Sequence, residues 1–281
     1  MINLRKFENS RKFGYLFFIQ YNGKKFDSFD ENSGKRSVKG DFIKGMTEMG
    51  ISWAKGVQQA SRTDSEVSAQ ENILYFSSNF SGDMNGIIQE FNKKNRYLQI
   101  ISVKKTYPDI VIPDYVEYRV YKYEIPEKYK ITSINDIEKR CKELSGTYDV
   151  SRFSDEKGDK LKEKVRSVEV KLEDGALIFK GNSFMPKQVR NMSGYILSGE
   201  IKLLPGHYLS LIKNGLNSEL VSSFLERDEE KIDGVEVVEK NNEIYLFYVK
   251  KEKRGEFIGK NGSNIKKIRK QYGKVVVRDF Y

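Results

Sequence analysis

The sequence is poor in the residues that build metal sites and disulfides. It has one cysteine, Cys141, and one histidine, His207, among 281 residues. A single cysteine cannot form an internal disulfide, and one cysteine with one histidine does not supply the ligands of a zinc site. These counts disfavour a metal hydrolase and a Cys-His nucleophile. We expect Cys141 to be a core residue and His207, at an expected helix start, to be structural or exposed.

Long apolar runs are also missing. No segment approaches the roughly 18 apolar residues that a membrane span needs. The apolar stretch at residues 15–19 is shorter than the core of a signal peptide. With 38% hydrophobic and 32% charged residues, the composition predicts a soluble globular protein with a charged surface. We expect such a protein to stay in the cytoplasm.

Positive charge is in excess, with a net charge of +10, and it is unevenly distributed. Residues 250–281 contain 11 Lys or Arg against 3 Asp or Glu, a balance of +8. The other 249 residues hold 39 basic against 37 acidic residues, a balance of only +2. Excess positive charge indicates a polyanionic partner. The distribution predicts that the C-terminal segment is a separate binding module.

Hydrophobic periodicity predicts an α+β chain whose second half repeats the order of the first. The first half is expected to contain a strand at 14–21 and a helix that Ser37 caps. Further strands are expected at 73–76, 98–103 and 115–125. The second half is expected to contain a helix from Ser133 and a hairpin at 165–181. Two helices, at about 185–198 and 208–226, and a strand at 243–249 are expected to follow.

One short segment is the candidate for the chemistry. Residues 60–69 read Ala-Ser-Arg-Thr-Asp-Ser-Glu-Val-Ser-Ala and are rich in small and turn-forming residues. By itself, an aspartate in such a segment is most often a turn or cap residue. Other segments accompany Asp64 in a fixed order, namely Tyr21-Asn22-Gly23, Arg36-Ser37-Val38, residues 118–123, 148–153 and 184–194.

In this order and spacing, the segments resemble the TruA-type tRNA pseudouridine synthase family over residues 14–249. The resemblance implies an isomerase that breaks the C1′–N1 bond of a uridine, rotates the base and rejoins it through C5. It implies tRNA as the partner, with the anticodon stem-loop as the target region, and a possible homodimer. It implies neither a cofactor nor a metal.

The resemblance also assigns roles to individual residues. Asp64 is the expected catalytic aspartate, as nucleophile or as base. Arg190 is the expected guanidinium beside it, and Tyr121 would pack against the flipped uracil. Arg62 would occupy the space that the extruded base leaves in the stack. Arg119, on the same strand as Tyr121, is expected to bind RNA.

Two positions depart from the family pattern. The family often has Gly-Trp-Gln where this chain reads Asp27-Ser28-Phe29, and usually has glycine where Glu66 stands. Both positions lie on elements that are expected to face the substrate. They bear on which uridine is modified more than on the chemistry.

Residues 257–277 resemble the latter half of a KH RNA-binding module. A Gly-x-x-Gly loop lets backbone N–H groups approach phosphates without obstruction by a Cβ atom. Spaced isoleucines at 258, 265 and 268 distinguish this segment from a solvated basic tail. We expect the module to be partial and to share the strand 243–249. The expected RNA-binding residues are Gly259, Lys260, Asn261, Gly262, Lys266 and Lys267.

Together these features predict an α+β fold. Two similar ferredoxin-like halves, residues 1–130 and 131–250, would form a mixed, mainly antiparallel sheet with helices on one side and a central cleft. A KH-like module would occupy residues 251–281. Because the body carries only +2, Asp64 would depend on the +8 tail to meet its substrate.

Two other functions remain open from the sequence. One is a non-catalytic RNA-binding or RNA-chaperone protein that keeps the synthase fold. The other is an unrelated α+β enzyme that acts on a small nucleotide, which fits poorly with the charged tail. The joint presence of Asp64, Arg190 and Tyr121 favours the enzyme over the binder.

Overall fold

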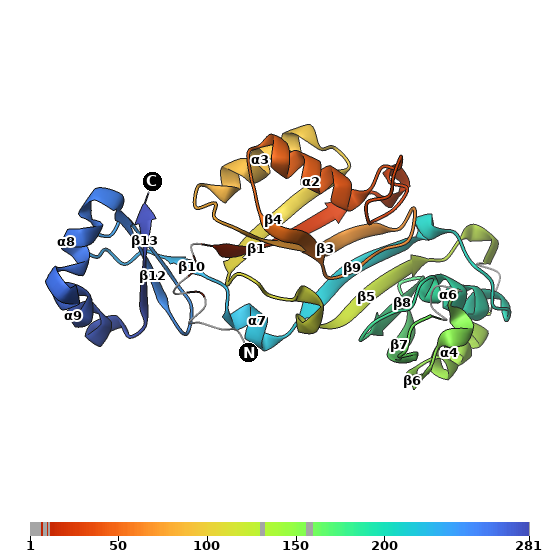
Figure 1. Cartoon of the computed structure of the whole chain (residues 1–281). Coiled ribbons are helices and arrows are strands. Elements are labelled where there is room, and N and C mark those ends of the chain that lie inside the picture. The colour runs from red at the N-terminus through yellow and green to blue at the C-terminus, as the bar shows by residue number, and fades with distance from the viewer. Residues whose placement is uncertain (1–6, 8–9, 11, 130–132, 156–159, 281) are drawn as a thin grey trace.

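The computed structural model describes residues 7, 10, 12–129, 133–155 and 160–280. Within these residues, a mixed nine-stranded sheet has the order β4-β1-β3-β9-β5-β8-β7-β6, with β2 paired to β3. Its strands are β1 (Phe13–Tyr21), β2 (Ala54–Gln59), β3 (Ser68–Ser78), β4 (Leu98–Thr106), β5 (Val116–Glu124), β6 (Gly146–Asp149), β7 (Val165–Glu173), β8 (Ala176–Gly181) and β9 (Leu209–Leu216). Figure 1 shows that the helices of the two halves cover the two ends of this sheet. These helices are α2 (Val38–Glu48), α3 (Met84–Lys94), α4 (Ile134–Glu143) and α6 (Gln188–Ser198). The predicted α+β fold is confirmed.

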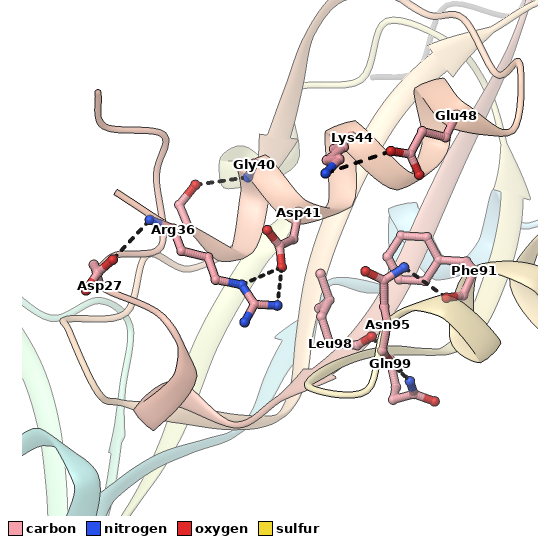
Figure 2. Close-up of polar contacts among 11 residues, drawn as sticks. Asp27, Arg36, Gly40, Asp41, Lys44, Glu48, Phe91, Asn95, Leu98 and Gln99 are labelled. Carbon is pink, nitrogen blue, oxygen red and sulfur yellow. Dashed lines mark hydrogen bonds and ion pairs between the residues drawn. The ribbon is translucent and has the colours of Figure 1, made fainter. Parts of the chain in front are cut away.

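The first half forms the predicted elements, and it also contains β2 and helix α3, which the sequence analysis did not predict. The Ser37 hydroxyl accepts a hydrogen bond of 3.1 Å from the Gly40 amide, so Ser37 caps α2 as expected. Figure 2 shows the Arg36 guanidinium directed at Asp41 in the first turn, with an N–O distance of 2.7 Å. A carboxylate in that turn also complements the positive end of the helix dipole. The apolar face of α2 is buried against the sheet.

The second half contains the predicted helix, hairpin and later helix, at α4, β7–β8 and α6. Helix α6 begins at Gln188 rather than near 185, because Lys187 has a left-handed φ of 61°. The helix that was predicted at about 208–226, after His207, is wrong. Residues 209–216 form β9 instead, followed by the short helix α7 (Ser218–Ser222).

Strand β9 joins the two halves of the sheet. It pairs in parallel with β3 through Ser68↔Ser210 and Ala69↔Leu211, and antiparallel with β5. Leu209 and Leu211 are buried, with a half-buried residue between them, which is the alternation of a strand. Pairing with neighbours on both sides satisfies its backbone groups, so tertiary context overrides the helical spacing of its leucines.

A second sheet of four strands has the order β10-β11-β12-β13 and lies at one end of the molecule (Figure 1). Its strands are β10 (Glu226–Asp228), β11 (Val237–Lys240), β12 (Tyr245–Lys250) and β13 (Val275–Phe280). Helices α8 (Arg254–Ile258) and α9 (Ser263–Tyr272) flank the Gly-x-x-Gly loop as predicted. The expected sharing of the 243–249 strand is also observed, because β12 pairs in parallel with β13.

The second sheet reaches back to Glu226, so three of its four strands precede residue 251, where the sequence had placed the border of the module. The other expected border, between residues 130 and 131, lies outside the described residues. In the part of the chain that the structure describes, no helix is long and apolar enough to cross a membrane.

Candidate active site

Asp64 lies in the loop of residues 60–67 that connects β2 to β3, hereafter the Asp64 loop. The loop borders a cavity of about 800 Å³. The other walls come from β5, from the segment that enters α6 and from the start of β9, which are distant in sequence. The predicted site residues among its lining are Arg62, Asp64, Arg119, Tyr121 and Arg190. The sheet order therefore gathers all five around one cavity.

Asp64 and Arg190 form an ion pair across this cavity. The distance from the Arg190 guanidinium to the Asp64 Oδ2 atom is 3.3 Å, and the two side chains are 14% and 31% exposed. Arg190 Nε donates a second hydrogen bond of 2.6 Å to the Leu204 carbonyl. That bond fixes the direction of the guanidinium. An adjacent cation, partly shielded from water, stabilises negative charge on the carboxylate.

Tyr121 is buried beside the ion pair. Its ring packs edge-to-face against Phe184, with a centroid distance of 5.4 Å and an interplanar angle of 88°. Burial raises the pKa of Tyr121, and the nearby Tyr21 and Asp64 raise it further. The hydroxyl therefore stays neutral at physiological pH. Phe184 was not among the predicted site residues, although it lies in the segment that carries Arg190.

The two other arginines have different surroundings. Arg62 has a side chain that is 71% exposed and lies 3.6 Å from Asp30 Oδ2. It borders both the main cavity and a smaller adjoining one of about 310 Å³. Arg119 instead donates to backbone carbonyls, among them that of Ala60 at 3.1 Å and that of Asn182. Burial lowers the pKa of Arg119. Its guanidinium braces the beginning of the Asp64 loop.

A buried polar network, absent from the predicted site, holds the residues before Asp64. Tyr21 and Thr63 share a hydrogen bond of 2.8 Å, and Asn72 Nδ2 donates to the Ser61 carbonyl at 2.9 Å. Ser61 donates to Asn214 Oδ1 at 2.5 Å, across 153 positions of sequence. Burial raises the pKa of Tyr21 to about 12. The network connects the loop to β1, β3 and β9. No local sequence motif predicts it.

Two glycines allow close approach to the other end of the loop. A Cβ atom on Gly23 would lie 2.2 Å from the Val67 carbonyl, and one on Gly206 would lie 2.4 Å from the Ser65 carbonyl. Neither position can carry a larger residue without displacing the loop. The glycine of the Tyr21-Asn22-Gly23 segment therefore has a packing role at the site.

Glu66 adopts a left-handed conformation with a φ of 66°. Glycine reaches this region without steric cost, and other residues rarely occupy it. The Glu66 carboxylate lies 3.7 Å from Nδ1 of His207, in the 3-10 turn Gly206–Tyr208. This geometry explains why glycine suits the position in the family pattern and identifies the neighbour of the acid in this chain.

The Gly-x-x-Gly loop has the backbone that its glycines permit. Gly259, Asn261 and Gly262 have φ values of 77°, 53° and 74°. A Cβ atom on Gly259 would lie 2.8 Å from Ser263 Oγ. Lys260, Lys266 and Lys267 are exposed. Within the described part of the chain, none of these three lysines has a carboxylate partner.

Comparison with known proteins finds similarity to two kinds of protein. The family model of the KH domain matches residues 217–279. The tRNA pseudouridine synthase A of Picrophilus torridus is 29% identical over an alignment of 202 residues, which covers 68% of this chain and 74% of that protein. The enzyme of the same name from Streptococcus uberis is 29% identical over an alignment of 208 residues, which covers 65% of this chain and 82% of that protein. That of Pyrococcus horikoshii is 31% identical over 154 residues, 54% of this chain and 55% of that protein. The predicted family resemblance is thereby confirmed: the chain is a relative of the tRNA pseudouridine synthases A, with a KH domain at its C-terminal end.

Proposed function

We propose that this chain is a tRNA pseudouridine synthase, an isomerase that converts uridine to pseudouridine in tRNA with Asp64 as its catalytic carboxylate. The observation that carries the proposal is the Asp64–Arg190 ion pair of 3.3 Å inside a cavity that Tyr121 also lines. The names of the relatives support the reaction and the substrate.

The reaction conserves atoms and needs no redox partner. The C1′–N1 bond of the uridine breaks, the base rotates, and a C1′–C5 bond forms. The proton that leaves C5 is balanced by one gained at N1. Asp64 serves either as nucleophile or as base, and both roles require an ionised carboxylate held away from bulk water. Arg190 places a positive charge 3.3 Å from this carboxylate.

The remaining cavity residues suit an extruded base. A cavity of about 800 Å³ lies in the size range of ligand sites and accommodates a nucleotide. The Tyr121 ring, locked by Phe184, offers a rigid neutral surface against which the uracil packs during its rotation. Arg62, exposed at the cavity mouth, is placed to enter the stack that the base leaves.

We also propose that the border between the body and the KH module lies near residue 217 rather than at 251. The KH family match begins at 217, and the strands of the second sheet begin at 226. The module then contains a complete four-stranded sheet and the helices α7, α8 and α9. A cytoplasmic location follows from action on tRNA, and the homodimer implied by the family resemblance is measurable by analytical ultracentrifugation.

The test is the substitution Asp64→Asn. We expect it to remove pseudouridine formation in tRNA, mapped by chemical derivatisation and sequencing, while tRNA affinity stays within a few-fold of that of the unsubstituted protein. Asp136→Asn, on the exposed face of α4, is the matched control and should leave turnover unchanged. Turnover of Asp64→Asn near that of the unsubstituted protein would contradict the assignment.

A further inference from the structure

The KH module uses both faces of its sheet. One face packs under α8 and α9 and has its own buried cluster of Val238, Phe247, Ile265 and Val275. The opposite face carries Leu246, Tyr248 and Val276, which belong to the main core of the body together with Phe13 and Tyr107. One continuous hydrophobic core therefore joins the module to the body, and we call this contact the junction.

A partly buried ion pair lies at the centre of this junction. Lys105 of β4 is 2.8 Å from Glu239 Oε1 of β11, and the two side chains are 16% and 17% exposed. Lys105 and Glu239 each also form a hydrogen bond with the Tyr248 hydroxyl, at 3.0 and 2.9 Å. The Lys105 ammonium lies 4.8 Å from the centre of the Phe13 ring. We expect partly buried charges with this many partners to favour one geometry of the junction.

Four further hydrogen bonds connect the body and the module at this junction. The Leu225 amide donates to the Lys105 carbonyl at 2.8 Å, and Thr106 shares a hydrogen bond of 2.6 Å with Ser223. From the last strand, Arg278 donates to the carbonyls of Phe7 and Ser10 at 2.8 and 2.7 Å. The junction thus includes the segment that enters the module and the last strand of the module. Attachment at several separate points opposes rotation about any one of them.

The Gly-x-x-Gly loop lies on the side of the module that faces away from the body. Figure 1 shows α8 and α9 at the outer end of the molecule, with β12 and β10 between them and the large sheet. The Asp64 cavity lies within the body, where β5 and β9 meet the start of α6. RNA on the Gly-x-x-Gly loop would therefore be held well away from Asp64, on an arm that does not move independently.

We propose that the KH module is a fixed arm that selects the uridine to be modified. It holds an unpaired tRNA segment of about four nucleotides at one distance and orientation from Asp64. Lys105, Glu239 and Arg278 are its positioning residues. A flexibly tethered module would raise the local RNA concentration at many uridines, whereas a rigid one favours a single geometry. The inference rests on the proposed function, and its substrate is a folded tRNA with the unpaired segment outside the target stem-loop.

The variants are designed to open the junction and then to close it again. Lys105→Met leaves the partly buried Glu239 without its cation, which should open the junction. The double variant Lys105→Met/Glu239→Leu removes both charges and keeps apolar contact, so it should remain closed. Arg278→Met opens the junction at a different point and serves if Lys105→Met fails to fold. None of these residues lines the Asp64 cavity.

The state of the junction is measured directly in the full chain. Spin labels at Lys44→Cys on α2 and Gln271→Cys on α9 report the distance between body and module, while the native Cys141 is buried. We expect one narrow distance distribution for the otherwise unsubstituted chain and for the double variant. A broad distribution is expected for Lys105→Met or Arg278→Met. A broad distribution in the chain with an intact junction would overturn the fixed arm.

Activity is then compared on full-length tRNA and on a stem-loop fragment that contains only the modified uridine. In the opened variants, kcat/KM on tRNA should fall at least tenfold, or pseudouridine should appear at additional positions. Turnover of the fragment should not change, which separates a positioning role from damage to the active site. The double variant should restore the normal pattern. Opened variants that modify the same uridine at the normal rate would overturn the proposal.

The two proposals fail in different ways. Absence of pseudouridine from every tRNA treated with the unsubstituted chain would refute the synthase activity, and with it the selection of a uridine. The distance distributions would still report whether the arm is fixed. A normal synthase with an unchanged product pattern in the opened variants would refute only the arm.

Discussion

The body and the KH module differ in how their candidate functional residues are assembled. In the body, Asp64 and Arg190 are 126 positions apart, and the cavity between them depends on the order of strands in the large sheet. In the module, the loop glycines and the lysines of α9 lie within nine consecutive residues. The body site is therefore a product of tertiary structure, whereas the module loop is a product of local sequence. Substitutions in the two regions should have different effects.

The two regions also differ in charge once they are divided near residue 217. Residues 1–216 hold 36 basic against 28 acidic residues, a balance of +8, and residues 217–281 hold 14 against 12, a balance of +2. Within the module, residues 217–249 carry −6 and residues 250–281 carry +8. The expectation of a nearly neutral body depended on a border at 251. With the proposed border at 217, the body itself carries +8, so we expect it to attract RNA, and we expect the module to contribute a polarised contact.

The largest effect that separates the regions is expected from Arg190→Met. It removes the cation beside Asp64, and loss of one such electrostatic contact lowers kcat by about 100- to 1000-fold. tRNA affinity should change little, because the residue lies within the cavity wall. Arg140→Met is a matched control. Like Arg190, Arg140 donates to a backbone carbonyl, in its case that of Ile196 in α6 at 2.8 Å, but it lies outside the cavity. Single-turnover rates measure both variants. Equal losses in the two variants would assign Arg190 to packing alone.

The next effect concerns the module. Replacement of Lys260, Lys266 and Lys267 by alanine should weaken tRNA binding by roughly tenfold or more. It should also lower the salt slope, which is the steepness of the fall of log K with log salt concentration, by about two, because binding with fewer phosphate contacts releases fewer counterions. Binding measured at several salt concentrations gives the slope. The remaining slope should stay well above zero, because the body carries +8. A slope near zero would mean that the charges that bind RNA lie in residues 250–281 and not in the body.

Point variants are needed for that test because the tail cannot be removed cleanly. Val275 and Val276 of β13 are buried, one in each of the two core clusters. Deletion of residues 251–281 would expose both clusters, so it would report on folding rather than on RNA contact.

The part of the fold that the sequence predicts correctly is the part with a local cause. The Ser37 cap, the hairpin of β7 and β8 and the Gly-x-x-Gly turn each depend on a few neighbouring residues. The sequence predicts a helix in place of β9 because the apolar residues of this region also fit a helical repeat, with Leu209, Ile212, Leu216 and Leu220 three or four positions apart. Its true state depends on β3 and β5, which the local pattern does not contain.

The site divides in the same manner. The resemblance selected five residues that the structure gathers around one cavity. It missed Phe184 and the network through Asn72 and Asn214, because their roles come from contacts across the sheet. Arg119, which it assigned to RNA, lines the cavity and donates to the Ala60 carbonyl, and its RNA contact stays a prediction. Function-bearing residues are visible in a motif, and the residues that hold them are visible only in the fold.

A moderate effect is expected from Tyr21→Phe, which removes the hydrogen bond to Thr63. The loss of one buried hydrogen bond should lower the free energy of unfolding by about 1 kcal/mol and turnover by a few-fold. The folded-state pKa of Tyr21 is raised to about 12, so folding favours its neutral form. Its contribution is fully present below about pH 10, the unfolded-state pKa, and is lost as the pH rises toward 12.

Denaturant titrations at about pH 9 and pH 11.5 test this sign, because Tyr21→Phe should flatten the alkaline loss of stability. Tyr75→Phe is the control. The pKa of Tyr75 is also raised to about 12, but its hydroxyl donates to the Tyr107 carbonyl outside the cavity. It should lower stability without lowering turnover. A turnover loss in both variants would mean that the network has no special effect on the Asp64 loop.

The smallest effect is expected from Glu66→Gly, which restores the residue of the family pattern. Release of the left-handed strain at a φ of 66° should exceed the added chain entropy and stabilise the fold by less than about 1 kcal/mol. Lys55→Gly, at a φ of 62° on β2, is the matched control with the same backbone gain outside the loop. Thermal unfolding should rise in both variants, whereas only Glu66→Gly, which removes an acid beside the cavity, should bind tRNA more tightly. Equal tRNA affinities in the two variants would show that Glu66 does not face the RNA, and the body would then owe its attraction for RNA to charges elsewhere on its surface.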